Sequence, residues 1–214
     1  MLICGIEEAG RGPVIGPMVM AAVCMHEKDL KLIQDTGAKD SKQLTPRKRE
    51  EIFEKIIKTA YSYKIIIVSP REIDEALESP NLNLNWLEAI TSAKLINSQN
   101  PDSVILDCPS NNLQAYKEYL MQFLNNKSIP IIAEHKADEN YPIVGAASIL
   151  AKVTRDKEIE KLRNKIKIDF GSGYPADPKT NKFLKENYNK FPEIFRKSWS
   201  SYKKVLNQSN LSQF

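Results

Sequence analysis

Residues 5–13 read Gly5-Ile6-Glu7-Glu8-Ala9-Gly10-Arg11-Gly12-Pro13. They include the end of a short apolar run that has the length and composition of a buried strand. Two adjacent carboxylates and a glycine-rich turn follow. Strand side chains alternate between faces, so Glu7 and Glu8 share a site only if the strand ends at the Ala9-Gly10 break and lets Glu8 turn. The stretch is compatible with a solvated acidic strand end or with half of a carboxylate site for a hard divalent cation.

The composition is that of an ordinary globular domain. The chain has 214 residues, of which 42% are hydrophobic and 27% charged, which predicts one domain or one domain with a helical extension. Cys4, Cys24 and Cys108 are far apart and lack metal-binding spacing, which argues against disulfides and zinc and indicates a reducing compartment. We find neither a signal peptide nor an apolar segment of membrane-spanning length, so we expect a cytoplasmic protein that contacts no membrane.

The net charge of +4 is unevenly distributed along the chain. From Lys152 onward there are about fifteen Lys and Arg residues against about seven Asp and Glu residues, whereas the part before it is slightly acidic. A basic C-terminal third beside an acidic part is expected of a polyanion-binding arm attached to a metal-binding core. Lysine-rich solvated helices would give the same count.

The pattern of apolar residues predicts a mixed α/β fold. Strands are expected at 2–6, 18–25, 63–68, 104–107 and 129–133. Helices are expected at 45–59, from 69, at 85–97, 112–124 and 141–166, from 177, and near 192 and 199. The first two strands are too close in sequence for a helical crossover and are predicted to be antiparallel neighbours. The later elements alternate as in βαβ units, so we expect a mixed sheet with helices on its faces.

Carboxylates stand at or just beyond three predicted strand ends. These are the pair Glu7 and Glu8, then Asp107, then Asp138. If the first and fourth strands are neighbours, Asp107 lies beside Glu7. Four carboxylates brought together would raise one another's pKa unless cations neutralised them. The cluster therefore predicts Mg²⁺ or Mn²⁺, and two such ions about 4 Å apart can support phosphodiester cleavage. Asp107 alone, at a strand end, would more often be a turn or cap residue, and it is the combination that favours a metal site.

The first stretch resembles the Asp-Glu-Ala-Gly-Arg-Gly signature of type 2 ribonuclease H, the ribonuclease HII family, particularly its archaeal members. Further blocks agree in the family's order, at 40–44, 107–109, 134–138, 146–156 and 171–180. The resemblance implies an RNase H-like mixed five-stranded sheet flanked by helices, with a helical C-terminal extension. It implies a catalytic domain at 1–165, a substrate-binding helical region at 166–207 and a tail at 208–214.

The resemblance also implies an activity and the residues that carry it. The family's catalytic and metal-binding tetrad falls on Glu7, Glu8, Asp107 and Asp138, holding two Mg²⁺ or Mn²⁺ ions. The implied enzyme is an endonuclease that cleaves RNA–DNA hybrids and incises 5′ of single ribonucleotides embedded in duplex DNA. Its products would carry 3′-hydroxyl and 5′-phosphate ends.

Several residues match the family's substrate contacts. Gly10, Arg11 and Gly12 match its ribonucleotide-recognition turn, where glycine lets the backbone approach the substrate closely and the 2′-OH distinguishes RNA from DNA. Tyr174 matches the aromatic side chain that stacks on the ribose, although without the resemblance it would be read as a turn residue packed on Pro175.

Three cations are candidate phosphate contacts: Lys42, Lys152 and Arg155. Each is also compatible with a surface or ion-paired position. His135 stands beside the predicted site, but the family's tetrad does not include it, and we expect a structural or supporting role.

One position departs from the family, which has aspartate where this chain has Glu7. The extra methylene displaces the carboxylate by more than about 1 Å, and catalytic sites are sensitive to such displacement. A shifted strand, a preference for Mn²⁺ or reduced activity are all compatible with the change. The alternative function is therefore an RNase H-fold protein that binds hybrids but has impaired catalysis.

The C-terminal residues from Gln208 to Phe214 are similar to the sliding-clamp peptide of replication and repair proteins. Leu211 and Phe214, at i and i+3, would share one side of a helical turn entering a groove. A frayed tail is the ordinary alternative. Beyond this possible partner we expect a monomer.

Two other enzyme classes share parts of this pattern. Ribonuclease HIII has similar catalytic blocks but typically an additional N-terminal domain, for which a chain whose first strand begins at residue 2 leaves no room. A small-molecule phosphatase could use a similar carboxylate cluster, but the basic C-terminal third and the chain-long resemblance argue against it.

Overall fold

The computed structural model describes residues 1–38 and 44–211, with the backbone alone for 209–211. The chain folds into two compact units made of interleaved segments. The sheet unit comprises Met1–Ala9, Val19–Ile67 and Asn85–Thr154. The helical unit comprises Gly10–Met18, Val68–Leu84 and the chain from Arg155 onward.

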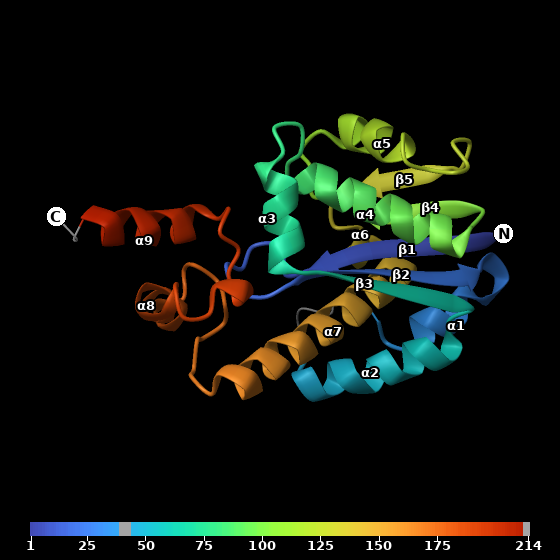
Figure 1. The fold of residues 1–214 in the computed structure, drawn as a ribbon. Coiled ribbons are helices and arrows are strands. Elements are labelled where there is room, and N and C mark those ends of the chain that lie inside the picture. The colour runs from blue at the N-terminus through green and yellow to red at the C-terminus, as the bar shows by residue number, and fades with distance from the viewer. Residues whose placement is uncertain (39–43, 212–214) are drawn as a thin grey trace. The chain divides into compact units, whose positions relative to one another are not determined.

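A five-stranded sheet forms the centre of the sheet unit (Figure 1). Its strands are β1 (Leu2–Ala9), β2 (Met18–His26), β3 (Ser62–Val68), β4 (Ser103–Asp107) and β5 (Ile131–Glu134), in the spatial order β3-β2-β1-β4-β5. β1 is antiparallel to β2 and parallel to β4, and β4 is parallel to β5. The predicted mixed sheet and the antiparallel pairing of the first two strands are confirmed. The first and fourth strands are neighbours, which is the condition for Asp107 to lie beside Glu7.

Helices cover both faces of this sheet. They are α1 (Leu30–Asp35), preceded by the 3-10 turn η1 (Glu27–Asp29), then α2 (Pro46–Thr59), α4 (Leu84–Gln99), α5 (Leu113–Met121), α6 (Ala137–Asn140) and α7 (Pro142–Ile166). Figure 1 shows α4 and α5 over one face, and α1, α2 and the first part of α7 over the other.

The first part of α7 is buried because its side chains are small or aliphatic. Val144, Ala147 and Leu150 are inaccessible to solvent and belong to a core that also contains side chains of β2 and α2. Gly5 of β1 permits the close approach of this helix, since a Cβ there would lie 2.5 Å from the carbonyl carbon of Ile143. β1, which carries the first two candidate carboxylates, is therefore fixed against α7.

The helical unit has a separate, aromatic core. It contains α3 (Pro70–Glu78), the second part of α7, α8 (Pro178–Asn187), the 3-10 turn η2 (Pro192–Ile194) and α9 (Ser200–Leu211). Phe170, Phe183 and Phe195 pack against one another in this core. Val14 and Ile15, from the loop after β1, are fully buried in the same cluster. The loop that carries the glycine-rich turn is thereby part of the hydrophobic core of the helical unit.

Local signals placed most helix boundaries. The side chains of Thr45, Ser69 and Asp177 accept N–H bonds at the starts of α2, α3 and α8, as their sequences predict. The prediction of a helix to 124 was wrong, because α5 ends at Met121. Short α1 and α6 were not predicted. No helix of the described residues is both long and apolar enough to span a bilayer.

Candidate functional site

Three of the four predicted carboxylates come together at one edge of the sheet. β1 and β4 pair in parallel, with Ile6 opposite Leu106, so Glu7 and Asp107 follow at adjacent positions. Asp138 arrives from α6, which begins shortly after β5. The backbone N–H of Ala137 donates to Oδ1 of Asp107 at 2.7 Å and ties this helix to the end of β4.

The ligand atoms of Glu7, Asp107 and Asp138 lie within 4.8 Å of one another. Glu7 is 7% exposed and Asp138 8% exposed, whereas Asp107 is half-buried. Burial, and then the charges of Glu8 and Asp107, raise the pKa of Glu7 well above its ordinary value. A compact, buried set of carboxylate oxygens under mutual repulsion is a donor set that suits Mg²⁺ or Mn²⁺.

Glu8 is placed differently from the other three. β1 remains regular through Ala9, with Glu7 opposite Ala21 and Glu8 opposite Met20. β1 thus ends at Ala9, at the break that the sequence indicated, and Glu8 still lies within its regular pairing. Glu8 is not part of the three-residue group, yet a hydrogen bond to its side chain contributes to the raised pKa of Glu7. Glu8 thus adjoins the cluster from the next position of the strand.

The longer side chain of Glu7 is accommodated within the regular strand. Its Oε1 accepts the backbone N–H of Glu8 at 2.9 Å, so the additional methylene lets the carboxylate fold back on its own chain. The other carboxylate oxygen of the same group is not engaged by this bond. β1 keeps its regular pairing with glutamate at this position.

His135 supports the site instead of joining it. Its Nδ1 lies 2.9 Å from the carbonyl oxygen of Cys108 and donates to it. The next residue, Lys136, has φ of +59° and turns the chain from β5 into α6. This geometry agrees with the expected supporting role, since the bond holds the turn that delivers Asp138.

In the helical unit, the glycine-rich turn contacts two other predicted substrate-binding residues. Gly10 has φ of +82°, and a Cβ there would collide with the side chain of Arg155. A Cβ on Gly12 would lie 3.3 Å from the ring of Tyr174. The guanidinium carbon of Arg155 is 6.0 Å from the centroid of that ring. Gly10 is therefore required by close packing and by its backbone conformation, whereas a Cβ on Gly12 would be a tight contact with the Tyr174 ring.

Arg155 is a buried cation with unused hydrogen-bond donors. It is 4% exposed, and its Nε and Nη2 atoms have no hydrogen-bond partner among the described residues. Burial lowers its pKa. Buried donors of native proteins are almost always satisfied, so each exception calls for an explanation. An anion that binds beside the turn would provide one.

Tyr174 is 45% exposed on a loop that is rigidly held. The hydroxyl of Thr180, which is inaccessible to solvent, accepts the N–H of Gly173 at 2.9 Å and donates to the carbonyl of Phe170 at 2.8 Å. The carbonyl of Gly173 in turn accepts the N–H of Val14 at 2.8 Å. These bonds fix the loop of Tyr174 to the loop that carries the turn.

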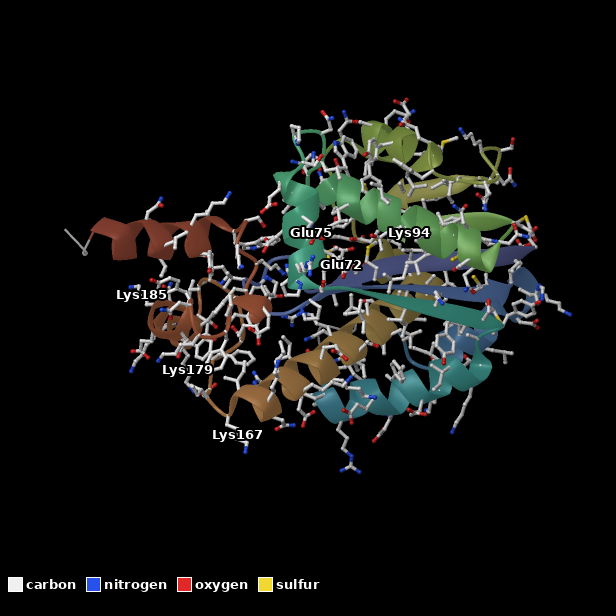
Figure 2. All side chains as sticks on the ribbon, in the orientation of Figure 1. Glu72, Glu75, Lys94, Lys167, Lys179 and Lys185 are labelled. Atoms are coloured by element: carbon white, nitrogen blue, oxygen red, sulfur yellow. The ribbon has the colours of Figure 1, made fainter. Side chains whose placement is uncertain are left out.

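Lys152 and Lys42 are the remaining predicted phosphate contacts. Lys152 lies half-buried on α7 in the sheet unit, and Lys42 lies outside the described residues. Figure 2 shows Lys167, Lys179 and Lys185 on the outer surface of the helical unit, where Lys179 pairs with Asp169 at 2.7 Å. This basic surface agrees with the charge asymmetry of the sequence.

The tail is described only in part. α9 continues through Leu211, and Gln208 is exposed on it. Phe214 lies outside the described residues.

Arg196 contacts the turn although no sequence pattern indicates it. It is fully buried and donates to the carbonyl oxygens of Gly10 and Arg11 at 2.6 and 2.8 Å. Its partners are backbone atoms more than 180 positions away. Such a contact has no periodicity or motif from which it could be predicted.

Comparison with known proteins agrees with this geometry. The family described as ribonuclease HII matches residues 4–202. A ribonuclease HII of Methanococcus maripaludis strain C6 is 49% identical over 212 residues, covering 97% of this chain and 88% of the relative.

Solved structures give the same result. The ribonuclease H2 of Pyrococcus horikoshii OT3 superposes with a TM-score of 0.90 at 42% identity, covering 98% of this chain and 99% of that one. A structure described as the PCNA:RNase HII complex of Archaeoglobus fulgidus matches with a TM-score of 0.83 at 38% identity, covering 94% and 96% of the two chains. With its acidic cluster, RNase H-like sheet and chain-long matches, the protein belongs to the ribonuclease HII family of metal-dependent nucleases.

Proposed function

We propose that this enzyme cleaves the RNA strand of RNA–DNA hybrids and incises duplex DNA 5′ of single embedded ribonucleotides, leaving 3′-hydroxyl and 5′-phosphate ends. The observation that carries this proposal is the convergence of Glu7, Asp107 and Asp138 at the edge of the sheet. Family membership supports the hybrid as substrate.

Glu7, Glu8, Asp107 and Asp138 would hold two divalent cations, Mg²⁺ or Mn²⁺. When bound, such ions supply positive charge that activates a water and stabilises the leaving oxygen. The carboxylates contribute fixed negative charge and position. The N–H of Ala137 holds Asp107 in orientation, and the N–H of Glu8 holds one oxygen of Glu7. Cations would also relieve the repulsion that raises the pKa of Glu7.

Recognition of the ribonucleotide falls, in this proposal, to Gly10, Arg11 and Gly12 with Tyr174. The support for this assignment is that the side chains of Arg155 and Tyr174 pack directly against Gly10 and Gly12, which brings these candidate residues together. Tyr174 is exposed and rigidly held, as a ring that stacks on a ribose must be. Arg155, with its unused donors, would bind a backbone phosphate.

Further contacts with the substrate are proposed from the distribution of positive charge along the chain. Lys42 and Lys152 are proposed as further phosphate contacts, and the region 166–207 as a helical substrate-binding part beside a catalytic domain at 1–165. Its excess of lysine and arginine supports this, since phosphate neutralisation supplies much of the affinity for nucleic acid.

The tail at 208–214 is proposed to bind a sliding clamp through Gln208, Leu211 and Phe214. The likeness to the Archaeoglobus fulgidus protein, whose structure is described as a complex with PCNA, supports it. Gel filtration of the full chain with an archaeal sliding clamp should give a co-eluting complex that Phe214→Ala abolishes. Separate elution of the unaltered chain would refute the partner.

A second candidate function is a hybrid-binding protein with impaired catalysis, and the glutamate at position 7 is the observation in its favour. The deciding experiment uses a DNA duplex with one ribonucleotide, in Mg²⁺ and in Mn²⁺, and compares the natural chain with Glu7→Asp. Incision 5′ of the ribonucleotide by the natural chain supports the nuclease. If only Glu7→Asp cuts, the protein is the impaired binder, and if both bind without cutting, the tetrad is wrongly assigned.

A further inference from the structure

Two side chains of one short segment hold the backbone of the glycine-rich turn. Arg196 donates from Nε to Gly16 O at 3.0 Å, from Nη1 to Arg11 O at 2.8 Å and from Nη2 to Gly10 O at 2.6 Å. All three nitrogens of one guanidinium group thus serve backbone carbonyls of the loop 10–16. A side chain that is 0% exposed and so engaged is rigid.

Trp199 completes this arrangement. Its Nε1 donates to Gly12 O at 3.0 Å, and its ring lies 4.8 Å from the guanidinium carbon of Arg196. The backbone N–H of Arg196 donates to Val14 O at 2.9 Å. We call Arg196 and Trp199 the carbonyl clamp, because together they bind the carbonyls of Gly10, Arg11, Gly12 and Gly16.

The clamp is anchored in turn by α3. Asp74, which is 8% exposed, accepts the N–H groups of Lys197 and Ser198 at 2.8 and 2.9 Å. It also accepts the Ser198 hydroxyl at 2.6 Å. The residues between the two members of the clamp are therefore fixed to a helix that is distant in sequence.

The hydrogen bonds to these carbonyls fix the direction in which the backbone N–H groups of the turn point. In a trans peptide the carbonyl of one residue and the N–H of the next point in opposite directions, and the described residues contain no cis peptide bond. Binding Gly10 O directs the N–H of Arg11 away from Arg196, and binding Arg11 O does the same for the N–H of Gly12. The clamp also keeps acceptor oxygens from turning toward a ligand on the opposite side.

We propose that Arg196, assisted by Trp199, is the positioning residue that sets the selectivity of the turn for a ribonucleotide over a deoxyribonucleotide. Discrimination by a hydrogen bond to a 2′-OH needs the turn's polar groups held in a single orientation, since a peptide that can rotate toward water loses little when the hydroxyl is missing. This inference rests on the proposed function and adds to it the residue that orients the recognition backbone.

The test measures binding of two duplexes that differ only in one ribose or deoxyribose. All proteins carry Asp107→Asn, which removes a proposed catalytic carboxylate and prevents cutting. Arg196→Lys leaves one ammonium for three carbonyls, and Trp199→Phe removes only the indole donor. Asn187→Ala is the control, because Asn187 is buried in the same unit but bonds to Phe183 O within α8.

We expect the parent to prefer the ribonucleotide duplex. Arg196→Lys should lower the ratio of the two dissociation constants about tenfold, and Trp199→Phe, which loses one bond, about threefold. Asn187→Ala should lower the stability but keep the ratio of the two dissociation constants. Unfolding reduces the number of active molecules and leaves the selectivity of the folded molecules unchanged. The positioning role is wrong if the parent discriminates between the duplexes and both Trp199→Phe and folded Arg196→Lys keep the parent's ratio of dissociation constants. If Arg196→Lys does not fold, Trp199→Phe decides alone. A parent without preference overturns the proposed recognition as well.

Discussion

The carboxylate cluster of the sheet unit and the turn of the helical unit both bring acceptor oxygens together, but they differ in what binds these oxygens. In the cluster, ionisable oxygens of Glu7, Asp107 and Asp138 meet within 4.8 Å, and burial with neighbouring charge raises the pKa of Glu7. In the turn, four carbonyl oxygens meet the donors of Arg196 and Trp199. The first arrangement calls for positive charge from outside, and the second is completed by the chain itself.

The difference separates two ways of building a functional site. A cluster under repulsion costs stability until a ligand binds, and that cost becomes part of its affinity for cations. A turn whose carbonyls are bound in advance costs nothing further when a substrate arrives, which is the condition for selective recognition. The cluster should therefore respond to cations and pH, whereas the turn should depend on the hydrogen bonds of the chain itself.

The largest effect is expected from neutralising one carboxylate of the cluster. Asp107→Asn or Asp138→Asn should lower cleavage of a ribonucleotide-containing duplex by more than about a hundredfold, since even residues that merely support a metal ligand are worth 10–100-fold. In the absence of divalent cations, the free energy of unfolding of these two variants should not fall below that of the natural chain, because the substitution removes repulsion between carboxylates. Asp35→Asn, at an exposed ion pair with Lys31, is the matched control and should keep its activity. Equal activity losses in all three variants would contradict a specific role.

Divalent cations should stabilise the protein, and Glu7→Gln should reduce this effect. At a concentration of Mn²⁺ one hundred times its dissociation constant, the stabilisation should be about 2.7 kcal/mol. Thermal unfolding with and without Mn²⁺ measures it. An unchanged melting temperature in Mn²⁺ would contradict the proposal that the carboxylate cluster binds divalent cations.

The pH dependence of the metal-free protein sharpens the same contrast. The pKa of Glu7 is raised above its ordinary 4.5, so the folded state binds this proton more tightly than the unfolded state does. Its unfavourable contribution is therefore absent below pH 4.5, grows as the pH rises to the folded pKa and is complete above it. Glu7→Gln should remove this loss, so the variant becomes more stable than the parent at high pH. Parallel stability curves for the two proteins would contradict the assignment.

A smaller effect is expected where the helical unit holds Tyr174. Thr180→Val leaves the N–H of Gly173 buried and unsatisfied, which should cost about 1–3 kcal/mol in the free energy of unfolding by urea. Thr91→Val is the control, because its buried hydroxyl only donates to Leu87 O within α4. It should cost clearly less. Equal losses would mean that the bond to Gly173 is not what fixes the loop.

The smallest effect concerns Asp177, at the start of α8. Hydrogen bonds from the N–H groups of Ser172 and Lys179 lower its pKa from 3.8 to about 2. Its contribution to stability is fully present above pH 3.8 and is lost as the pH falls through 2. The difference in stability between the natural chain and Asp177→Asn should shrink across that interval. A difference independent of pH would show that the carboxylate's charge plays no part.

Local sequence rules determined much of the fold. The apolar runs of β1 and β2 are too close in sequence to be joined by a helix, which forces them to pair as antiparallel neighbours. The side-chain caps at Thr45, Ser69 and Asp177 bond to groups three residues away or fewer, so their chemistry is legible in the sequence. The carboxylates at strand ends and the family's ordered motifs indicated the residues of the cluster.

Other features depended on atoms that the sequence does not bring together. The regular end of β1 through Glu8 follows from its pairing with β2, and Asp138 reaches Asp107 because short α6 is tied to the end of β4.

The sequence by itself determined the mixed sheet and the capped helix starts and indicated the carboxylates of the cluster, because those signals lie in neighbouring residues. Only the tertiary structure decided which oxygens need an external cation and which are bound by Arg196. That distinction depends on backbone carbonyls, which every residue has and which no sequence pattern marks.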